Sequence, residues 1–247
     1  MAETCPECGG TGWRIIERDG LSAAERCRCF AATMSTATWE HAGVPDNYRR
    51  ASFENFRLPE KGQNPIAHDA MARAYLAVMG YAREFPAVDK PGLLLIGDPG
   101  TGKTHLAVAA LRSIIERGHH GVFWGYQHLL DSIRSGYDPA SGASDREAYE
   151  EALEAEVLLL DDLGAHRVTE WVEDTVTSLI TYRCNNRKPL IATTNLPDAE
   201  MGAEGVSKAA TTLTDRIGMR ARSRLFEMCR IVTMPRVQDY RIRTAVR

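Results

Sequence analysis

The chain has 247 residues, a formal net charge of −3, 44% hydrophobic residues and 26% charged residues. These proportions are typical of a globular protein and exclude a disordered chain or a fibrous repeat. The apolar runs are too short for a transmembrane helix, and the first residues lack the basic start and apolar core of an export signal. We therefore expect a cytoplasmic protein of one or two domains that does not bind a membrane.

Two kinds of residue are unevenly distributed along the chain. Four of the six cysteines fall in the first 29 residues. From Arg216 to Arg247 there are nine arginines against two acidic residues, which gives this segment a charge of +7 and leaves −10 for the rest of the chain. The net charge of −3 therefore combines an acidic body with a basic C-terminal segment. This weakly acidic net charge excludes a protein that coats nucleic acid by bulk charge.

The N-terminal cysteines have the spacing of metal ligands. Cys5 and Cys8 are followed, after 18 residues, by Cys27 and Cys29. Two closely spaced pairs of thiolates are the usual ligand set of tetrahedral Zn²⁺, so we predict a small zinc-binding module. Four unligated thiols or an iron–sulfur cluster are the alternatives, and the lack of an export signal disfavours disulfides.

A connector follows at residues 31–64, and we place a domain boundary near residue 50, between an N-terminal module with its connector (1–50) and a second domain (51–247). Helical periodicity predicts a helix over about 65–82, and further helices are expected at about 145–156 and 171–180. Short apolar runs alternate with these patterns at 92–98, 121–126, 157–162, 189–195 and 230–234. This alternation predicts an α/β fold, with a mostly parallel sheet that helices cover on both faces.

Residues 97–104 match the pattern G-x-x-x-x-G-K-[ST] between an apolar strand and a helix. The glycines let the backbone curl so that several N–H groups point at a phosphate, and the following helix adds its N-terminal dipole. Lys103 would contact the β- and γ-phosphates of ATP, and Thr104 would bind Mg²⁺. A glycine-rich turn without a ligand is the alternative. The predicted nucleotide-binding residues are Gly97, Asp98, Pro99, Gly100, Thr101, Gly102, Lys103 and Thr104.

Two later strands end in polar residues. The run at 157–162 closes with Asp161 and Asp162, and the run at 189–195 closes with Asn195. Asp161 suits coordination of magnesium together with Thr104, and Asp162 suits orientation or deprotonation of an attacking water. Asn195 would reach the γ-phosphate or that water. The alternative for each strand end is an ordinary polar turn.

Three arginines of the basic segment are spaced four residues apart. On a helix, Arg216, Arg220 and Arg224 would share one face. They form either a solvated basic face or a face that contains an arginine finger, which is supplied to the ATP of a neighbouring subunit. In the second case, hydrolysis would depend on self-association.

Several segments between about residues 45 and 241 carry a joint resemblance. They are PDNYRRASFENF (45–56), GDPGTGKTHLA (97–107), LLLDDLGA (158–165), ATTN (192–195), RARSRLFEMC (220–229) and DYR (239–241). Together they resemble the DnaC/IstB branch of AAA+ ATPases, which comprises bacterial helicase loaders and transposition helpers. FWGYQHLLDSIRSGYD (123–138) is similar to the helical segment associated with single-stranded DNA in loaders.

The resemblance implies a three-layer P-loop AAA+ domain that assembles in the presence of ATP. It implies that Arg224 is the arginine finger with Arg220 beside it, and that Arg241 acts on the nucleotide. The cysteine module looks like that of zinc-bearing loaders of the DnaI type, which use it to hold the ring helicase. Contact with single-stranded DNA would involve Trp124, Tyr126, Arg134 and Tyr137, although aromatic residues in the core or at an interface are the alternative.

The chain also predicts that the helical lid of an AAA+ domain is reduced or absent, because only 13 residues follow the last predicted strand. The predicted function is ATP-dependent loading of the replicative helicase onto single-stranded DNA, with ATP, Mg²⁺ and Zn²⁺ as cofactors. One alternative is a transposition helper ATPase. The other, from a different class, is a zinc-bearing adaptor that binds nucleotide without hydrolysing it.

Overall fold

The fold is known from a computed structural model, which describes residues 5–9, 11, 13–18, 21–27, 38–135, 144–198, 200 and 211–245. Its centre is a five-stranded sheet in the order β4-β5-β6-β3-β7, in which every neighbouring pair is parallel. The strands are β3 (Gly92–Ile96), β4 (Gly121–Gly125), β5 (Val157–Asp161), β6 (Leu190–Thr194) and β7 (Cys229–Thr233). All five apolar runs of the sequence therefore form strands, and the predicted α/β fold is confirmed.

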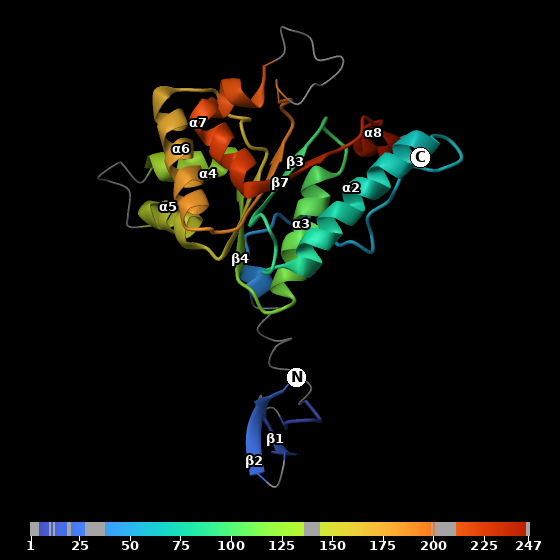
Figure 1. The fold of residues 1–247 in the computed structure, drawn as a ribbon, viewed down its shortest axis with the longest axis vertical. Coiled ribbons are helices and arrows are strands. Elements are labelled where there is room, and N and C mark those ends of the chain that lie inside the picture. Colours follow the sequence, from blue (N-terminus) through green and yellow to red (C-terminus); the bar gives the residue numbers. More distant parts are fainter. Residues whose placement is uncertain are drawn as a thin grey trace.

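Helices cover both faces of this sheet (Figure 1). One face carries α2 (Pro65–Glu84) and α3 (Lys103–Ile115), and the other carries α4 (Tyr126–Ser135), α5 (Ser144–Glu154), α6 (Glu170–Asn185) and α7 (Leu213–Met228). Side chains alternate along a strand, so Leu93 and Leu95 of β3 join the core under α2 and α3, whereas Leu94 and Ile96 join the opposite core. These two cores fix the carboxyl ends of β3, β5 and β6 along one edge of the sheet.

The chain that leads into α2 belongs to the same core. Ala42, Val44 and Ala51 are buried with the side chains of α2 and α3, and the Ala42 carbonyl accepts a hydrogen bond of 2.7 Å from the backbone N–H of Phe123 in β4. The division into residues 1–50 and 51–247 stays a prediction. The packing shows that the last part of the predicted connector is built into the sheet domain.

Two smaller features lie at the ends of the described chain. Near the N-terminus, β1 (Trp13–Arg18) and β2 (Leu21–Arg26) form an antiparallel hairpin that the sequence patterns did not predict. After β7, the described residues contain the six-residue helix α8 (Tyr240–Ala245). Across the described ranges, no helix has the length and apolar character needed to cross a membrane.

Candidate functional site

The predicted phosphate loop connects the buried strand β3 to α3. Gly100 and Gly102 have φ angles of 75° and 92°, which residues with a side chain rarely adopt. Close packing also requires glycine at position 102, since a Cβ there would lie 2.7 Å from the ring of Phe56. The Thr101 hydroxyl donates to the Asp98 carbonyl at 2.8 Å. The loop is thus preshaped, with the N-terminus of α3 behind it.

Lys103 is 6% exposed although its side chain carries the charge of the loop. Its Nζ donates to the carbonyls of Gly97 and Asp98, each at 2.8 Å, and to Oδ1 of Asn195 at 2.7 Å. Burial lowers the pKa of Lys103 to about 8, and the nearby carboxylates of Asp162, Asp161 and Asp98 limit the shift. The ammonium group is therefore held ready at the loop rather than extended into water.

Asp161 lies at the carboxyl end of β5 and accepts two hydroxyl groups on one oxygen. Thr104 Oγ1 donates to its Oδ1 at 2.9 Å, and Thr193 Oγ1 donates at 2.6 Å. Burial raises the pKa of Asp161, while these two hydrogen bonds oppose the shift. A carboxylate and a hydroxyl at this spacing suit Mg²⁺, which prefers oxygen ligands and is usually bound by few protein groups. Thr104 and Asp161 are thus brought together as the sequence predicted.

Asp162 has a φ angle of 59°, an uncommon conformation for a residue other than glycine. Its backbone N–H donates to Thr193 Oγ1 at 2.9 Å, and its Oδ1 accepts from Asn195 Nδ2 at 2.5 Å. Asn195 therefore connects Asp162 to Lys103 through its two amide atoms. Sequence reasoning missed Thr193, which lies in β6 two residues before Asn195, although alternate residues of an extended chain point to the same side.

The phosphate loop opens into a cavity of about 690 Å³. Its wall combines the phosphate loop and the polar strand ends with two segments distant in sequence, the entry segment around Tyr48 and Phe56 and the C-terminal segment around Tyr240 and Arg241. Arg241 lines the cavity, where it pairs with Asp239 at 2.9 Å, and its action on the nucleotide stays a prediction. The contribution of the entry segment depends on tertiary packing, and no local motif marks it.

The prediction that Arg216, Arg220 and Arg224 share one continuous helical face is wrong. Gly218 has φ 78° and ψ 158°, so α7 consists of two helical pieces joined by a kink. Arg216 lies before the kink and donates to the His166 carbonyl at 3.2 Å. Arg220 and Arg224 lie after it, where both are exposed.

The second piece of α7 is anchored by an ion pair that sequence reasoning did not find. Arg222 donates through Nε and Nη2 to both carboxylate oxygens of Asp198, at 2.6 and 2.7 Å. The Asp198 side chain is fully buried, and a two-point pair of this kind fixes orientation as well as distance. On the exposed side of the same piece, Arg224 pairs with Glu227 at 2.6 Å.

The candidate DNA-contacting residues differ in their surroundings. Tyr126 is 2% exposed and belongs to the core, so the structure favours the alternative for this residue. Trp124 is partly buried and donates its indole N–H to Glu151 at 2.8 Å. Arg134 lies over the ring of Trp171, 4.8 Å from its centroid. Tyr137 lies outside the described residues.

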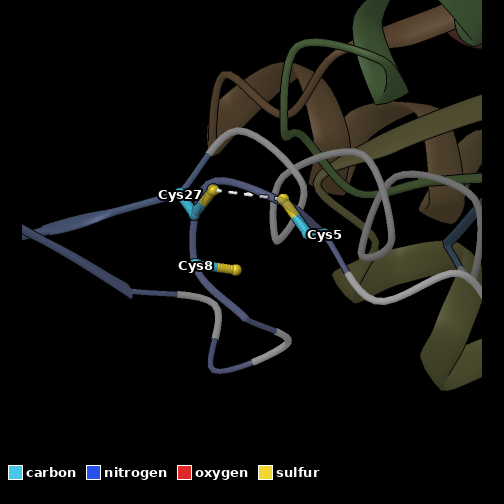
Figure 2. Close-up of side chains that lie close together, drawn as sticks. All are labelled: Cys5, Cys8 and Cys27. Atoms are coloured by element: carbon cyan, nitrogen blue, oxygen red, sulfur yellow. Dashed lines mark hydrogen bonds between the residues drawn. The ribbon is translucent and has the colours of Figure 1, made fainter.

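Three of the four predicted zinc ligands come together beside the β1–β2 hairpin (Figure 2). The Sγ atoms of Cys5, Cys8 and Cys27 all lie within 4.8 Å of one another, and those of Cys5 and Cys27 are 3.9 Å apart. Sulfur ligands of a tetrahedral zinc ion are about 3.8 Å apart, given Zn–S bonds of about 2.3 Å. The donor set therefore fits zinc, while Cys29 lies outside the described residues.

A parallel sheet with a phosphate loop after β3, an acidic group at the end of β5 and an amide after β6 defines a P-loop nucleotide-binding ATPase. The model of the IstB-like ATP binding proteins matches residues 76–243, more than half of the chain. The chain belongs to this family, and its sheet and site are those of an AAA+ ATPase, as the sequence predicted.

The individual relatives have low sequence identity to this chain, but the matches cover most of its length. The chain is 25% identical over 216 residues to YqaM of Bacillus subtilis, a match that covers 84% of this chain and 61% of YqaM. It is 23% identical over 185 residues to the replicative helicase loader DnaC of Escherichia coli K12, covering 75% and 71% of the two chains. The chain therefore spans less than two thirds of the length of YqaM but a larger part of DnaC.

Solved structures share the fold. A crystal structure of the DnaC helicase loader superposes with a TM-score of 0.62 and 28% identity, covering 77% of this chain and all of that chain. A crystal structure of DnaI gives a TM-score of 0.59 at 19% identity, covering 78% of this chain and 95% of that one. The DnaI match supports the fold alone.

Proposed function

We propose that this protein loads the replicative helicase onto single-stranded DNA in an ATP-dependent cycle. The observation that carries the proposal is the likeness to the DnaC helicase loader in both sequence and structure, combined with an intact set of phosphate-loop and strand-end contacts. We expect the protein to act in the cytoplasm.

Within this proposal, each residue of the site has a defined task. The phosphate loop binds the triphosphate, with Lys103 supplying the compensating charge. Thr104 and Asp161 would hold Mg²⁺, and the ion would supply charge neutralisation for the phosphates. Asp162, fixed by Asn195, orients the attacking water and accepts its proton. The hydrogen bond between Asn195 and Lys103 links this water-handling group to the phosphate-binding group.

Hydrolysis depends on self-association through the ATPase domain. Arg220 and Arg224 are exposed on the second piece of α7, which the Arg222–Asp198 pair anchors. We assign Arg224 as the finger that enters the site of a neighbouring subunit, with Arg220 beside it. Arg224 must exchange its pair with Glu227 for the phosphate, and an exposed, solvent-screened pair of this kind holds it only weakly.

The cysteine module forms the helicase-binding part of the proposed loader. Cys5, Cys8 and Cys27 would hold Zn²⁺ together with Cys29. Zinc binding would give the N-terminal module a fixed shape, since this short segment has no large core of its own. Contact with single-stranded DNA is assigned to the segment around Trp124 and Arg134.

The proposal is tested with purified replicative helicase from the same organism, immobilised and incubated with the protein with and without ATP. We expect ATP-dependent capture, and stimulation of ATP turnover by helicase and single-stranded DNA. Lys103→Ala should abolish ATP binding, whereas Arg224→Ala should bind ATP normally and lose the stimulated turnover. Arg73→Ala, which removes an exposed arginine of α2, is the matched control and should behave as the wild type.

Other outcomes point to other functions. The match to IstB-like proteins makes a transposition helper the second candidate, and ATP-dependent capture by a purified transposase without capture by helicase would establish it. A protein that binds ATP but shows no turnover with helicase, transposase or DNA would be a nucleotide-bound adaptor. Loss of ATP binding in Arg224→Ala would remove that residue from the role of finger.

A further inference from the structure

The segment after β7 returns across the phosphate loop. The backbone N–H of Met234 donates to the Ile96 carbonyl at 2.7 Å, and that of Tyr240 donates to the Gly100 carbonyl at 3.1 Å. Between these contacts, Asp239 lies against the loop, because a Cβ on Gly100 would be 2.1 Å from its Cγ and its Oδ1. Glycine at position 100 therefore leaves room for the Asp239 carboxylate.

Asp239 engages Arg241 at three points. The backbone N–H of Arg241 donates to Oδ1 at 2.9 Å, its Nε donates to Oδ1 at 3.1 Å, and its Nη2 donates to Oδ2 at 2.9 Å. These hydrogen bonds lower the pKa of Asp239, so the carboxylate is ionised at neutral pH. Asp239 is only 22% exposed and Arg241 is 68% exposed, which leaves the cation at the edge of the cavity and the anion against the loop.

This arrangement opposes the binding of phosphate in two ways. A guanidinium group is well suited to phosphate, but two of the nitrogen donors of the Arg241 side chain are already directed at Asp239. The charge of Asp239 also stays beside Gly100, where it repels the phosphates of an incoming nucleotide. Nucleotide must therefore compete with a fixed carboxylate for the arginine that lines its own site.

We propose that Asp239 sets the nucleotide affinity of the subunit by holding Arg241 in a competing ion pair beside the phosphate loop. Asp239 is thus a positioning residue, and its presence keeps binding by a single subunit weak. The proposal rests on the proposed function only in that nucleotide binds at the phosphate loop. It does not depend on the identity of the partner that the protein loads.

The test compares Asp239→Asn, which keeps the size of the side chain and removes its charge, with the wild type. Calorimetric titration with Mg-ATP and Mg-ADP should show binding that is about two- to tenfold tighter in the variant, the range for loss of an exposed ion pair and its repulsion. The same substitution should also tighten binding in an Arg241→Ala background, because the unpaired carboxylate then repels the phosphates. Asp239→Ser provides a second variant without the charge.

Three controls separate electrostatics from a structural effect. Adenosine, which has no phosphate, should bind the wild type and Asp239→Asn equally. The difference in ATP affinity should shrink as salt rises. Glu116→Gln removes a carboxylate from another surface arginine pair, with Arg112 at 2.8 Å, and should leave ATP affinity unchanged.

Unchanged or weaker ATP binding in folded Asp239→Asn and Asp239→Ser would overturn the proposal, as would an equal gain for adenosine. Circular dichroism and thermal melting establish the folding of each variant. Failure of the wild-type protein to bind any nucleotide would instead overturn the nucleotide site itself. A wild type that binds ATP but captures no helicase would overturn only the proposed loading function and leave the comparison at Asp239 valid.

Discussion

The charge of Lys103 should make nucleotide affinity fall as the pH rises above neutrality. Burial lowers the pKa of Lys103 to about 8, and its ammonium group already uses three oxygen acceptors at the loop. With this pKa the side chain is about 90% protonated at about pH 7 and about 10% protonated at about pH 9. If phosphates bind only the charged form, affinity falls about tenfold over this range, or about 1.4 kcal/mol.

Two other effects of pH, on the charge of the nucleotide and on the stability of the fold, do not weaken nucleotide binding over this range. Phosphate monoesters lose their second proton near about pH 6, so a nucleotide does not lose charge in this range. Because the pKa of the folded lysine is below its unfolded value, the energetic penalty of burying the charge disappears as the pH rises from about 8 to about 10.5, so the stability of the fold increases through this range. Loss of nucleotide affinity on deprotonation of Lys103 is therefore not caused by unfolding of the protein.

The assay is titration of a fluorescent ATP analogue at several pH values and constant ionic strength. Lys103→Arg is the matched variant, because its guanidinium stays charged throughout, and whatever affinity it retains should not change over the range. Wild-type affinity that stays constant between about pH 7 and about pH 9, or an equal decline in Lys103→Arg, would refute the link between the lysine charge and binding.

Three further predictions concern structure around the site. Arg183 is fully buried and donates to five backbone carbonyls at the end of α5 and before β6, so Arg183→Met should lower the free energy of unfolding by about 3 kcal/mol in urea titrations; a change under about 1 kcal/mol would contradict this. Gly218→Ala should cost about 1–3 kcal/mol, because φ is 78° and a Cβ would lie 2.3 Å from Glu173 Oε1; Glu173→Ala should restore only the part due to the clash, whereas full restoration would exclude backbone strain. The wild type should contain about one zinc ion per chain by mass spectrometry under native conditions, and Cys8→Ser should lose it; a fully loaded variant would argue against the cysteine site.

Local patterns were sufficient wherever function depends on neighbours in sequence. The phosphate loop needs glycines, a lysine and a hydroxyl at fixed spacing between a strand and a helix, and in the structure Lys103 contacts Asn195 and Thr104 contacts Asp161. Parallel strands end at one edge of a sheet, so the polar ends of β5 and β6 were expected to meet there. Asp161, Asp162 and Asn195 do lie beside the loop. They do so because the parallel strands that carry them all run toward the same edge of the sheet, and no detail of side-chain packing is needed.

Tertiary structure decided what depends on contacts between distant segments or on one backbone angle. Gly218 separates Arg216 from the other two arginines, because a single glycine in a helical pattern does not reveal whether it will be helical. Tyr126 is buried because of the strands and helices that pack on it, which aromatic composition does not show. The contact of Asp239 with Gly100 brings together residues 139 positions apart in the chain. Sequence alone thus determined the chemistry of the phosphate loop, whereas the return of the chain over that loop decided which charges surround it.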